Sequence, residues 1–248
     1  MIRIENISKK FRKLKALDKL SATFDKGQVV SLIGPNGSGK TTLIKCILGM
    51  VKPAEGKIYV NGTKINGDPS YRDKIGYMPQ IGRYPDNMRV GQLFTMMKHI
   101  RNASEEDLDV ELITKFNLVS IFDKPMRTLS GGTRQKVSAA LAFYFNPDIL
   151  ILDEPTAGLD PLSSEILKEK IIQEKKKRKL ILITSHILSD LDELTTHVMY
   201  LQEGKLQFFK DIDSLREETG ELKLGKAIAA IMKGQQLDSA WINKMFAK

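Results

Sequence analysis

A glycine-rich segment between an apolar run and a helical pattern constrains the fold of this chain more than any other feature. The segment reads Gly34-Pro35-Asn36-Gly37-Ser38-Gly39-Lys40-Thr41, with two glycines separated by four residues and followed by Lys and Thr. Glycines let backbone N–H groups curl around phosphate oxygens, and the N-terminus of the following helix adds partial positive charge. An ordinary glycine-rich turn can lie anywhere in a chain, whereas this segment follows a strand-like run and opens a helical pattern. The context therefore indicates a phosphate-binding loop. In it, Lys40 would reach the β- and γ-phosphates and Thr41 would ligate Mg²⁺.

Short apolar runs alternate with helical patterns along most of the chain, which is typical of a mostly parallel sheet covered on both faces. Strands are predicted at Gln28–Ile33, Lys57–Val60, Ile75–Met78, Ile149–Leu152, Leu180–Thr184, His197–Leu201 and Lys205–Phe208. Helices are predicted at Lys40–Leu48, Gly131–Phe145, Pro161–Glu174 and Ile187–Leu194. Earlier strands around Ile2–Ile4 and Leu20–Phe24 indicate an antiparallel β-layer. The predicted fold class is α/β, a phosphate-loop NTPase core with this added layer and an inserted helical lobe.

The inserted lobe is predicted from residues 86–128, which are rich in helix formers and poor in β-branched runs. Helical patterns lie there at Val90–Arg101 and Glu105–Phe116. From Asp211 onward the chain is predicted to form short helices punctuated by glycines, at Asp211–Glu218, Leu222–Lys233 and Asp238–Phe246. We therefore expect a nucleotide-binding domain over residues 1–215, containing the lobe, and a short helical C-terminal extension over residues 216–248.

Two acidic residues follow the apolar strand Ile149–Leu152 directly. Ligands of such folds bind at the carboxyl ends of the parallel strands, so a carboxylate there would lie beside the phosphate loop. Asp153 is predicted to hold Mg²⁺, and Glu154 to orient and polarise an attacking water. His186 follows another strand at the same edge, where it could donate a hydrogen bond to a γ-phosphate. Without the phosphate loop, the acidic pair would equally suit a strand-end turn.

The tetrapeptide Leu129-Ser130-Gly131-Gly132 opens a predicted helix with a serine and two glycines. Its backbone N–H groups and the helix N-terminus could receive a second phosphate. Taken alone, the tetrapeptide is equally well explained as an ordinary N-cap.

Composition limits the class of protein. Lys and Arg total 39 against 30 Asp and Glu, giving a formal charge of +9, which suits nucleic acid, anionic lipid or polyphosphate ligands without choosing among them. A single cysteine, Cys46, excludes an internal disulfide and indicates a reducing compartment. The N-terminal residues lack the apolar run of a signal peptide, and no stretch approaches the ~20 apolar residues of a membrane span.

In order and spacing, these motifs resemble the nucleotide-binding domains of ABC transporters over roughly Ile2 to Phe209. Leu129–Gly132 matches the family's signature, which implies that it binds the γ-phosphate of ATP held by a second subunit. Two ATP molecules would then be sandwiched in a head-to-tail dimer. By the same resemblance, Phe11 would stack on adenine and Gln80 would sense Mg²⁺ and water. Ala157-Gly158-Leu159-Asp160 resembles the D-loop and His186 the switch histidine.

The resulting site prediction has three groups. Catalytic roles are expected for Glu154, His186 and Gln80. The Mg²⁺ ligands are expected to be Thr41, Gln80 and Asp153. The ATP-binding residues are expected to be Phe11, Gly34, Pro35, Asn36, Gly37, Ser38, Gly39, Lys40, Thr41, Thr42, Ser130, Gly131, Gly132 and Asp160.

Small departures from the family pattern leave this prediction intact. Phe11 stands where tyrosine is commoner, and Thr133 follows the signature where glutamine is more usual. Since no catalytic position is degenerate, the resemblance implies that both sites of a homodimer hydrolyse ATP. A RecA-like ATPase or small kinase would lack the signature. A DNA-maintenance ATPase of this type would need a long coiled coil, and a translation-associated one would need a second cassette.

The resemblance also implies partners. We expect a second copy of the chain, a membrane-spanning permease and, through the permease, a periplasmic accessory protein, with no nucleic acid partner. The chain would then lie in the cytoplasm at the inner face of the membrane. Docking of the permease is predicted near Gln80–Met88, where Ile81-Gly82-Arg83-Tyr84-Pro85 mixes the residue types enriched at interface anchors.

Three short segments point to a narrower group. Tyr77–Gln80, Ser185–Ser189 and Thr219–Glu221 resemble the ATPase of the transporter that supports nitrous-oxide reductase copper-site maturation, within the ABC-2 exporter group. The alternatives are a general ABC-2 exporter of another substrate and a non-transport ABC ATPase.

Overall fold

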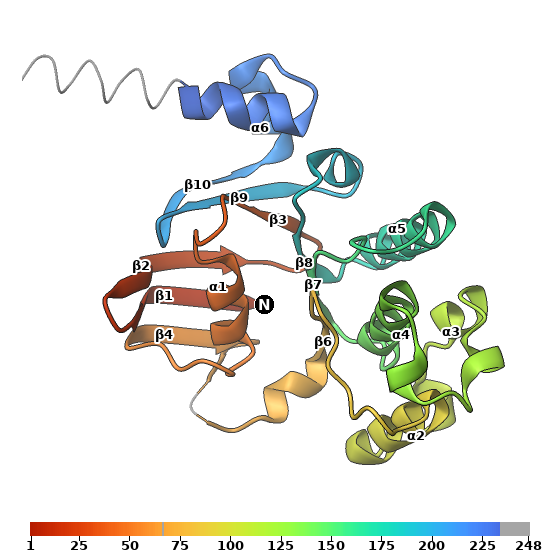
Figure 1. Cartoon of the computed structure of the whole chain (residues 1–248). Coiled ribbons are helices and arrows are strands. Elements are labelled where there is room, and N and C mark those ends of the chain that lie inside the picture. Colours follow the sequence, from red (N-terminus) through yellow and green to blue (C-terminus); the bar gives the residue numbers. More distant parts are fainter. Residues whose placement is uncertain (66, 234–248) are drawn as a thin grey trace, which may run out of the picture.

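The computed structural model describes residues 1–65 and 67–233 and contains two β-sheets with helices around them (Figure 1). The larger sheet has six strands in the order β10-β9-β3-β8-β7-β6. β3 pairs in parallel with β8 and β9, and β7 pairs in parallel with β6 and β8, whereas β10 joins β9 in antiparallel orientation. The strands are β3 (Val29–Ile33), β6 (Ile75–Met78), β7 (Ile149–Asp153), β8 (Leu180–Thr184), β9 (His197–Gln202) and β10 (Lys205–Asp211).

Every residue of β3, β7 and β8 is buried, as expected for strands covered on both faces. Side chains alternate between the faces. Leu150 and Leu152 join one hydrophobic cluster, while Ile149 and Ile151 join the other. The first cluster lies against the helices α4 (Gly131–Phe143) and α5 (Pro161–Lys176). The second lies against the helix α1 (Lys40–Ile47) and the smaller sheet, so that layers cover both faces of the larger sheet (Figure 1). The predicted α/β fold class is thereby confirmed.

The smaller sheet is antiparallel, with the order β2-β1-β4-β5. It consists of β1 (Ile2–Phe11), β2 (Leu14–Phe24), β4 (Glu55–Val60) and β5 (Thr63–Lys64). β1 and β2 are much longer than the two short strands predicted, because Phe11 pairs with Leu14 across a two-residue turn and continues the hairpin through a lysine-rich segment. Polar residues on its exposed face hide the strand pattern in the sequence.

The longer helices are α1 (Lys40–Ile47), α2 (Val90–Arg101), α3 (Glu111–Lys115), α4 (Gly131–Phe143), α5 (Pro161–Lys176) and α6 (Ile212–Thr219). Short 3₁₀ turns cover Ser70–Lys74, Glu105–Asp107, Leu118–Ile121, Met126–Thr128 and Leu188–Leu191. Residues 224–233 are also helical. Within the described residues, no helix is long and apolar enough to cross a bilayer.

Two helix predictions were wrong. The pattern Glu105–Phe116 is split, because the Ser104 hydroxyl bonds the Asp107 carboxylate and the Asp109 carboxylate accepts from the Glu111 amide. Such local side-chain bonds compete with a continuous helix. In place of a helix at Ile187–Leu194 there is only the turn Leu188–Leu191, preceded by hydrogen bonds that the Ser185 hydroxyl makes with the backbone of Ile187.

The C-terminal predictions fare unevenly. A helix does occupy residues 224–233, near the predicted Leu222–Lys233. The predicted helix Asp238–Phe246 lies outside the described residues. The boundary predicted after residue 215 falls within α6, and both it and the limits of the helical lobe stay predictions.

Candidate nucleotide site

The glycine-rich segment connects β3 to α1, as predicted from its sequence context. Gly34 has φ of 153°, and a Cβ there would lie 2.0 Å from the carbonyl oxygen of Leu201 on β9. Gly39 caps α1 with φ of 107°, and its Cβ would lie 2.6 Å from the Ala16 carbonyl oxygen. Both positions therefore require glycine, so that the loop can pass close to β9 and β2 before the helix begins.

The side chains of this loop match the chemistry expected of it. Lys40 Nζ donates to the Gly34 carbonyl at 2.6 Å and to the Pro35 carbonyl at 3.1 Å, which holds the ammonium over the loop. Burial lowers the pKa of Lys40, while the nearby Glu154 and Asp153 act in the opposite direction. Within the described residues, the Ser38 hydroxyl is buried with no hydrogen-bond partner. An unpaired buried hydroxyl in a loop of this shape suits a phosphate oxygen.

The acidic pair at the end of β7 is held by the neighbouring strand β8. The Thr184 hydroxyl donates to Asp153 Oδ1 at 2.5 Å. The Glu154 amide donates to the Thr184 carbonyl at 3.1 Å and lies 3.0 Å from its hydroxyl. His186 Nε2 lies 2.8 Å from Glu154 Oε1, so the histidine and the second carboxylate form a pair at the sheet edge.

One cavity of about 440 Å³ joins most of the predicted site. It is lined by Phe11, Leu14, Ala16, Asn36, Gly37, Ser38, Gly39, Lys40, Thr41, Thr42, Gln80, Asp153, Glu154 and His186. The lining includes the three predicted Mg²⁺ ligands and all three predicted catalytic residues. The predicted ATP-binding residues Gly34, Pro35, Ser130, Gly131, Gly132 and Asp160 do not line it.

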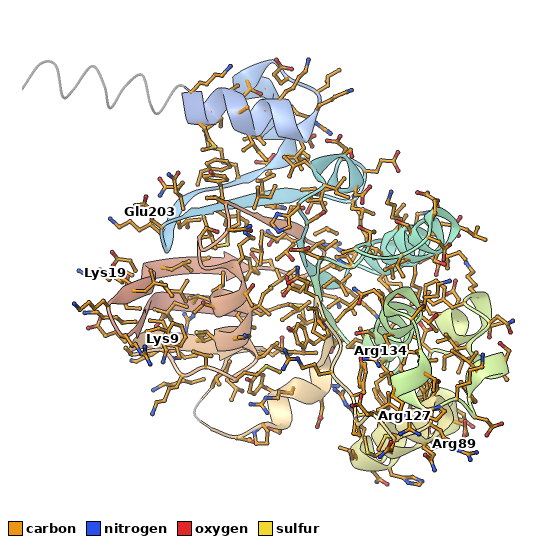
Figure 2. The ribbon with its side chains drawn as sticks, in the orientation of Figure 1. Lys9, Lys19, Arg89, Arg127, Arg134 and Glu203 are labelled. Atoms are coloured by element: carbon orange, nitrogen blue, oxygen red, sulfur yellow. The ribbon has the colours of Figure 1, made fainter. Side chains whose placement is uncertain are left out.

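The β1–β2 hairpin forms the apolar side of the cavity. Phe11 and Leu14 are cross-strand partners and therefore face the same side of the hairpin. Lys9 Nζ lies 5.2 Å from the Phe11 ring centroid and donates to the Lys52 carbonyl. In Figure 2, Lys9 and Lys19 mark the outer part of this sheet.

Three residues around the cavity were missed by the sequence reasoning. Leu14 and Ala16 lie within the long hairpin that was predicted only in part, so neither the pairing of Leu14 with Phe11 nor the place of Ala16 at the cavity could be predicted. Thr184 gave one signal: it is a hydroxyl residue at the end of an otherwise apolar strand. Its partner Asp153 is 31 residues away, so the hydrogen bond itself could not be read from spacing.

Ser130 caps α4, its hydroxyl accepting from the Thr133 amide at 3.2 Å. The cap and the two glycines therefore form a helix N-terminus outside the cavity, among the helical segments on the α2 side of the molecule. Arg127 and Arg134 lie in the same region (Figure 2), where Arg127 donates to Asn87 and Arg134 to the Met126 carbonyl. Asp160 caps α5, accepting from the Ser163 amide at 2.9 Å.

No group of three or more His, Cys, Asp or Glu that could hold a metal occurs within residues 1–65 and 67–233. The predicted Mg²⁺ set contains a single carboxylate, with a hydroxyl and an amide oxygen, from Thr41, Gln80 and Asp153. These are hard oxygen donors, of the kind Mg²⁺ prefers when phosphate and water supply the remaining ligands.

Comparison with known proteins gives a consistent result. A sequence profile described as ABC transporter matches residues 17–157. The uncharacterized ABC transporter ATP-binding protein YhaQ of Bacillus subtilis (strain 168) is 36% identical over 209 residues, covering 83% of this chain and 69% of that protein. NatA, an ABC transporter ATP-binding protein of the same organism, is 33% identical over 88% of this chain and 92% of its own length. The lantibiotic transport ATP-binding protein SrtF of Streptococcus pyogenes is 33% identical over 86% of this chain and 92% of its own.

Solved structures agree with these relatives. An ATP-binding subunit of an ABC transporter superposes with a TM-score of 0.86 at 27% identity, covering 94% of this chain and 99% of the other. A dimeric ATP-binding cassette bound to ADP and Pi shares the fold, with a TM-score of 0.76 at 24% identity over 86% of this chain and 99% of its own. The profile match over more than half of the chain, with relatives at 33–36% identity, shows that this chain belongs to the ABC transporter family as an ATP-binding subunit, a class of protein that binds and hydrolyses ATP.

Proposed function

We propose that this chain hydrolyses Mg-ATP within a head-to-tail dimer of two copies, and that the closing and opening of the dimer drive a membrane-spanning permease. The proposal rests on the separation between the nucleotide cavity and the Ser130–Gly132 segment. Phe11, the phosphate loop and the residues with predicted catalytic roles share one cavity, whereas Ser130–Gly132 form a helix N-terminus outside it. A second phosphate-binding edge that does not face its own nucleotide suits a nucleotide held by another copy.

Within one copy, each side chain has a distinct task. Lys40 and the loop amides bind the β- and γ-phosphates, and Phe11 with Leu14 holds the base. Glu154 orients the attacking water and accepts its proton. His186, which pairs with Glu154 at 2.8 Å, is proposed to donate to the γ-phosphate. The low-dielectric edge of the sheet strengthens each of these interactions.

Mg²⁺ fits the residues present. Thr41, Gln80 and Asp153 offer oxygen donors on one cavity, and the Thr184 hydroxyl fixes one oxygen of Asp153, which leaves its other oxygen for the ion or its water. When bound, Mg²⁺ would neutralise charge on the transferring phosphoryl group. The carboxylate is 5% exposed, so a cation beside it would also offset the cost of burying its charge.

Sedimentation of the Glu154→Gln variant tests the dimer. This change keeps the shape of the side chain but removes the proton acceptor, so ATP should bind and persist. We expect a monomer without nucleotide and a dimer with Mg-ATP, together with hydrolysis about 10²–10⁴-fold slower than in the wild-type protein. Near wild-type turnover would contradict the role of Glu154. If Glu154→Gln stays a monomer at high concentration with Mg-ATP, then two copies of this chain do not form the dimer by themselves.

For the permease, we propose docking on the segment after β6, which starts at Gln80 in the cavity. Tyr84, the aromatic residue of the predicted docking segment, packs partly buried against the core, and burial raises the pKa of its phenol. Ile81 is 70% exposed and is the better candidate for the contact. Ile81→Ser should weaken assembly with the permease and leave the basal ATPase of the isolated chain unchanged. Unchanged assembly would move the docking site elsewhere.

We further propose that the permease is of the ABC-2 exporter type and that the chain acts at the inner face of the cell membrane. The exporter type is supported by the three short segments described above. The relatives include both a lantibiotic transport ATP-binding protein and a molybdate/tungstate import ATP-binding protein of Methanocaldococcus jannaschii, which is 36% identical over 223 residues. The narrower proposal, copper-site maturation of nitrous-oxide reductase with a periplasmic accessory protein, rests on the three short segments. Deleting this chain in its host should then leave that reductase without copper, and a fully loaded reductase would exclude it.

A further inference from the structure

The loop that follows the acidic pair lies directly against the helix that Ser130 caps. A Cβ placed on Gly132, the second residue of α4, would come 2.7 Å from the carbonyl oxygen of Gly158. The backbone of the loop is therefore packed on the first turn of α4, and only a glycine on the helix allows this distance. Residues 157–160 and Ser130–Gly132 thus form a continuous surface within one chain.

One turn further along α4, an ion pair joins the same two segments. Lys136 Nζ lies 2.8 Å from Asp160 Oδ2. Asp160 also accepts from the Ser163 amide at 2.9 Å and from the Ser163 hydroxyl at 2.8 Å, which makes it the N-cap of α5. The hydrogen bond from Lys136, followed by those from Ser163, holds the pKa of Asp160 well below its usual range. One carboxylate therefore ties α4, the loop and α5 together.

The rest of the loop is fixed at its other end. The Thr156 hydroxyl donates to Asp190 at 3.0 Å, and the Ala157 amide donates to the Glu154 carbonyl at 3.1 Å. The Lys136 ammonium also lies over the Phe116 ring, 6.0 Å from its centroid. Lys136 is 24% exposed and Asp160 51%, so the ion pair between them is partly sheltered from water.

We propose that Lys136 is a positioning residue for the dimer: it holds Asp160 and the 157–160 loop on α4, so that the loop and the Ser130–Gly132 edge meet the second copy as one preformed surface. The proposal rests on the head-to-tail dimer described above. Without the lysine, the side-chain contact between the loop and α4 is lost, and any freedom that the loop gains must be removed during association, which weakens binding. Lys136 does not line the nucleotide cavity, so ATP affinity of the single copy does not depend on it.

The test uses the full chain carrying Glu154→Gln, in which ATP-driven association is measured as a dimer dissociation constant by sedimentation equilibrium. Adding Lys136→Gln should raise that constant by about 2- to 30-fold, since each copy contributes one partly exposed ion pair. Nucleotide affinity of dilute monomer should stay the same. Lys136→Arg should restore association, because it keeps the charge and the donor. Lys115→Gln, which removes a charge of the same sign from α3, is the matched control and should have no effect.

A double-mutant cycle separates positioning through Asp160 from general stability. In a chain that already carries Asp160→Asn, Lys136→Gln should cause no further loss of association, since its partner is gone. Three results would overturn the proposal while leaving the dimer intact. Lys136→Gln could weaken association equally with and without Asp160→Asn, or Lys136→Arg could fail to restore association. The dimer dissociation constant of Lys136→Gln could also equal that of the Lys115→Gln control. If Glu154→Gln alone stays monomeric with ATP, the dimer itself fails, and this inference fails with it.

Discussion

The buried ammonium of Lys170 should contribute more to stability than any exposed charge of this chain. Lys170 lies on α5 and is 1% exposed. Its Nζ contacts Asp109 at 2.5 Å, Glu111 at 2.8 Å and Glu174 at 3.2 Å. Changing Lys170 to Met keeps the length and apolar stem of the side chain and removes only the charge, which leaves three neighbouring carboxylates without their common partner.

The size of the effect follows from what each carboxylate keeps. Removing one partner of a buried pair costs about 3–5 kcal/mol. Glu174 retains Lys177 at 2.8 Å and Lys179 at 2.5 Å, so the cost should lie near the lower end, about 3 kcal/mol. For a chain of this length, about 2–4 °C are lost per kcal/mol, so the melting temperature should fall by about 6–12 °C. Thermal unfolding by circular dichroism measures this directly.

The matched control is Lys115→Met. Lys115 also contacts Glu111, at 3.0 Å, but it is 35% exposed, so its loss should lower the melting temperature much less than the loss of Lys170 does. If Lys170→Met lowers the melting temperature no more than Lys115→Met does, then the buried network does not hold the 105–115 segment on α5, and the reasoning is refuted.

The difference in stability between the wild-type protein and Lys170→Met should become smaller as the pH falls. Although burial alone would raise it, hydrogen bonds from Lys170, Lys115 and Gln173 lower the pKa of Glu111 to about 2. A carboxylate with a lowered pKa stabilises the fold above its unfolded pKa, and this contribution is lost as the pH falls toward the folded value. The wild-type protein should therefore lose this contribution between about pH 4.5 and pH 2, whereas the variant has less of it to lose. If the difference in stability between the two proteins does not change with pH, this account is contradicted.

Two further variants test the cavity. Lys40→Ala removes the charged donor above the phosphate loop, so titration calorimetry should show ATP affinity falling by about 10- to 100-fold, and unchanged affinity would exclude a phosphate contact. Thr184→Val is nearly isosteric but removes the hydroxyl that holds Asp153 and accepts from Glu154. It should raise the Mg²⁺ concentration needed for half-maximal hydrolysis by about 10-fold with little change in Mg²⁺-free nucleotide binding, and an unchanged Mg²⁺ requirement would show that Thr184 does not position Asp153.

The features that were predicted well are those whose residues all lie within one short segment of the sequence. The strands β3, β7 and β8 are unbroken apolar runs, and the phosphate loop carries its glycines within eight residues. Asp153, Glu154 and His186 were expected on one cavity because parallel strands bring their carboxyl ends to one edge, whereas Gln80 was expected there from the family resemblance alone. Their chemical roles remain predictions that the variants above address.

Features that depend on distant partners were missed. Lys170 and Asp109 are 61 residues apart, and nothing in the lysine-rich end of α5 distinguishes the buried Lys170 from its exposed neighbours. The long β1–β2 hairpin was missed for a related reason, since cross-strand pairing of Phe11 with Leu14 overrides the weak strand preference of its lysines. Local hydrogen bonds then broke the predicted helix Glu105–Phe116, a competition that hydrophobic periodicity does not report.

Glu154 has φ of 52°, in the left-handed region that residues with a side chain rarely occupy. Such a conformation costs about 1–3 kcal/mol, and the hydrogen bonds of its amide to Thr184 help to maintain it. The turn separates adjacent carboxylates: Asp153 stays on the strand against Thr184, while Glu154 turns to His186. The chain then enters the loop that Lys136 holds on α4. Glycine would adopt this backbone without strain but supplies no carboxylate, so a glutamate at this strained position agrees with the catalytic role proposed for it.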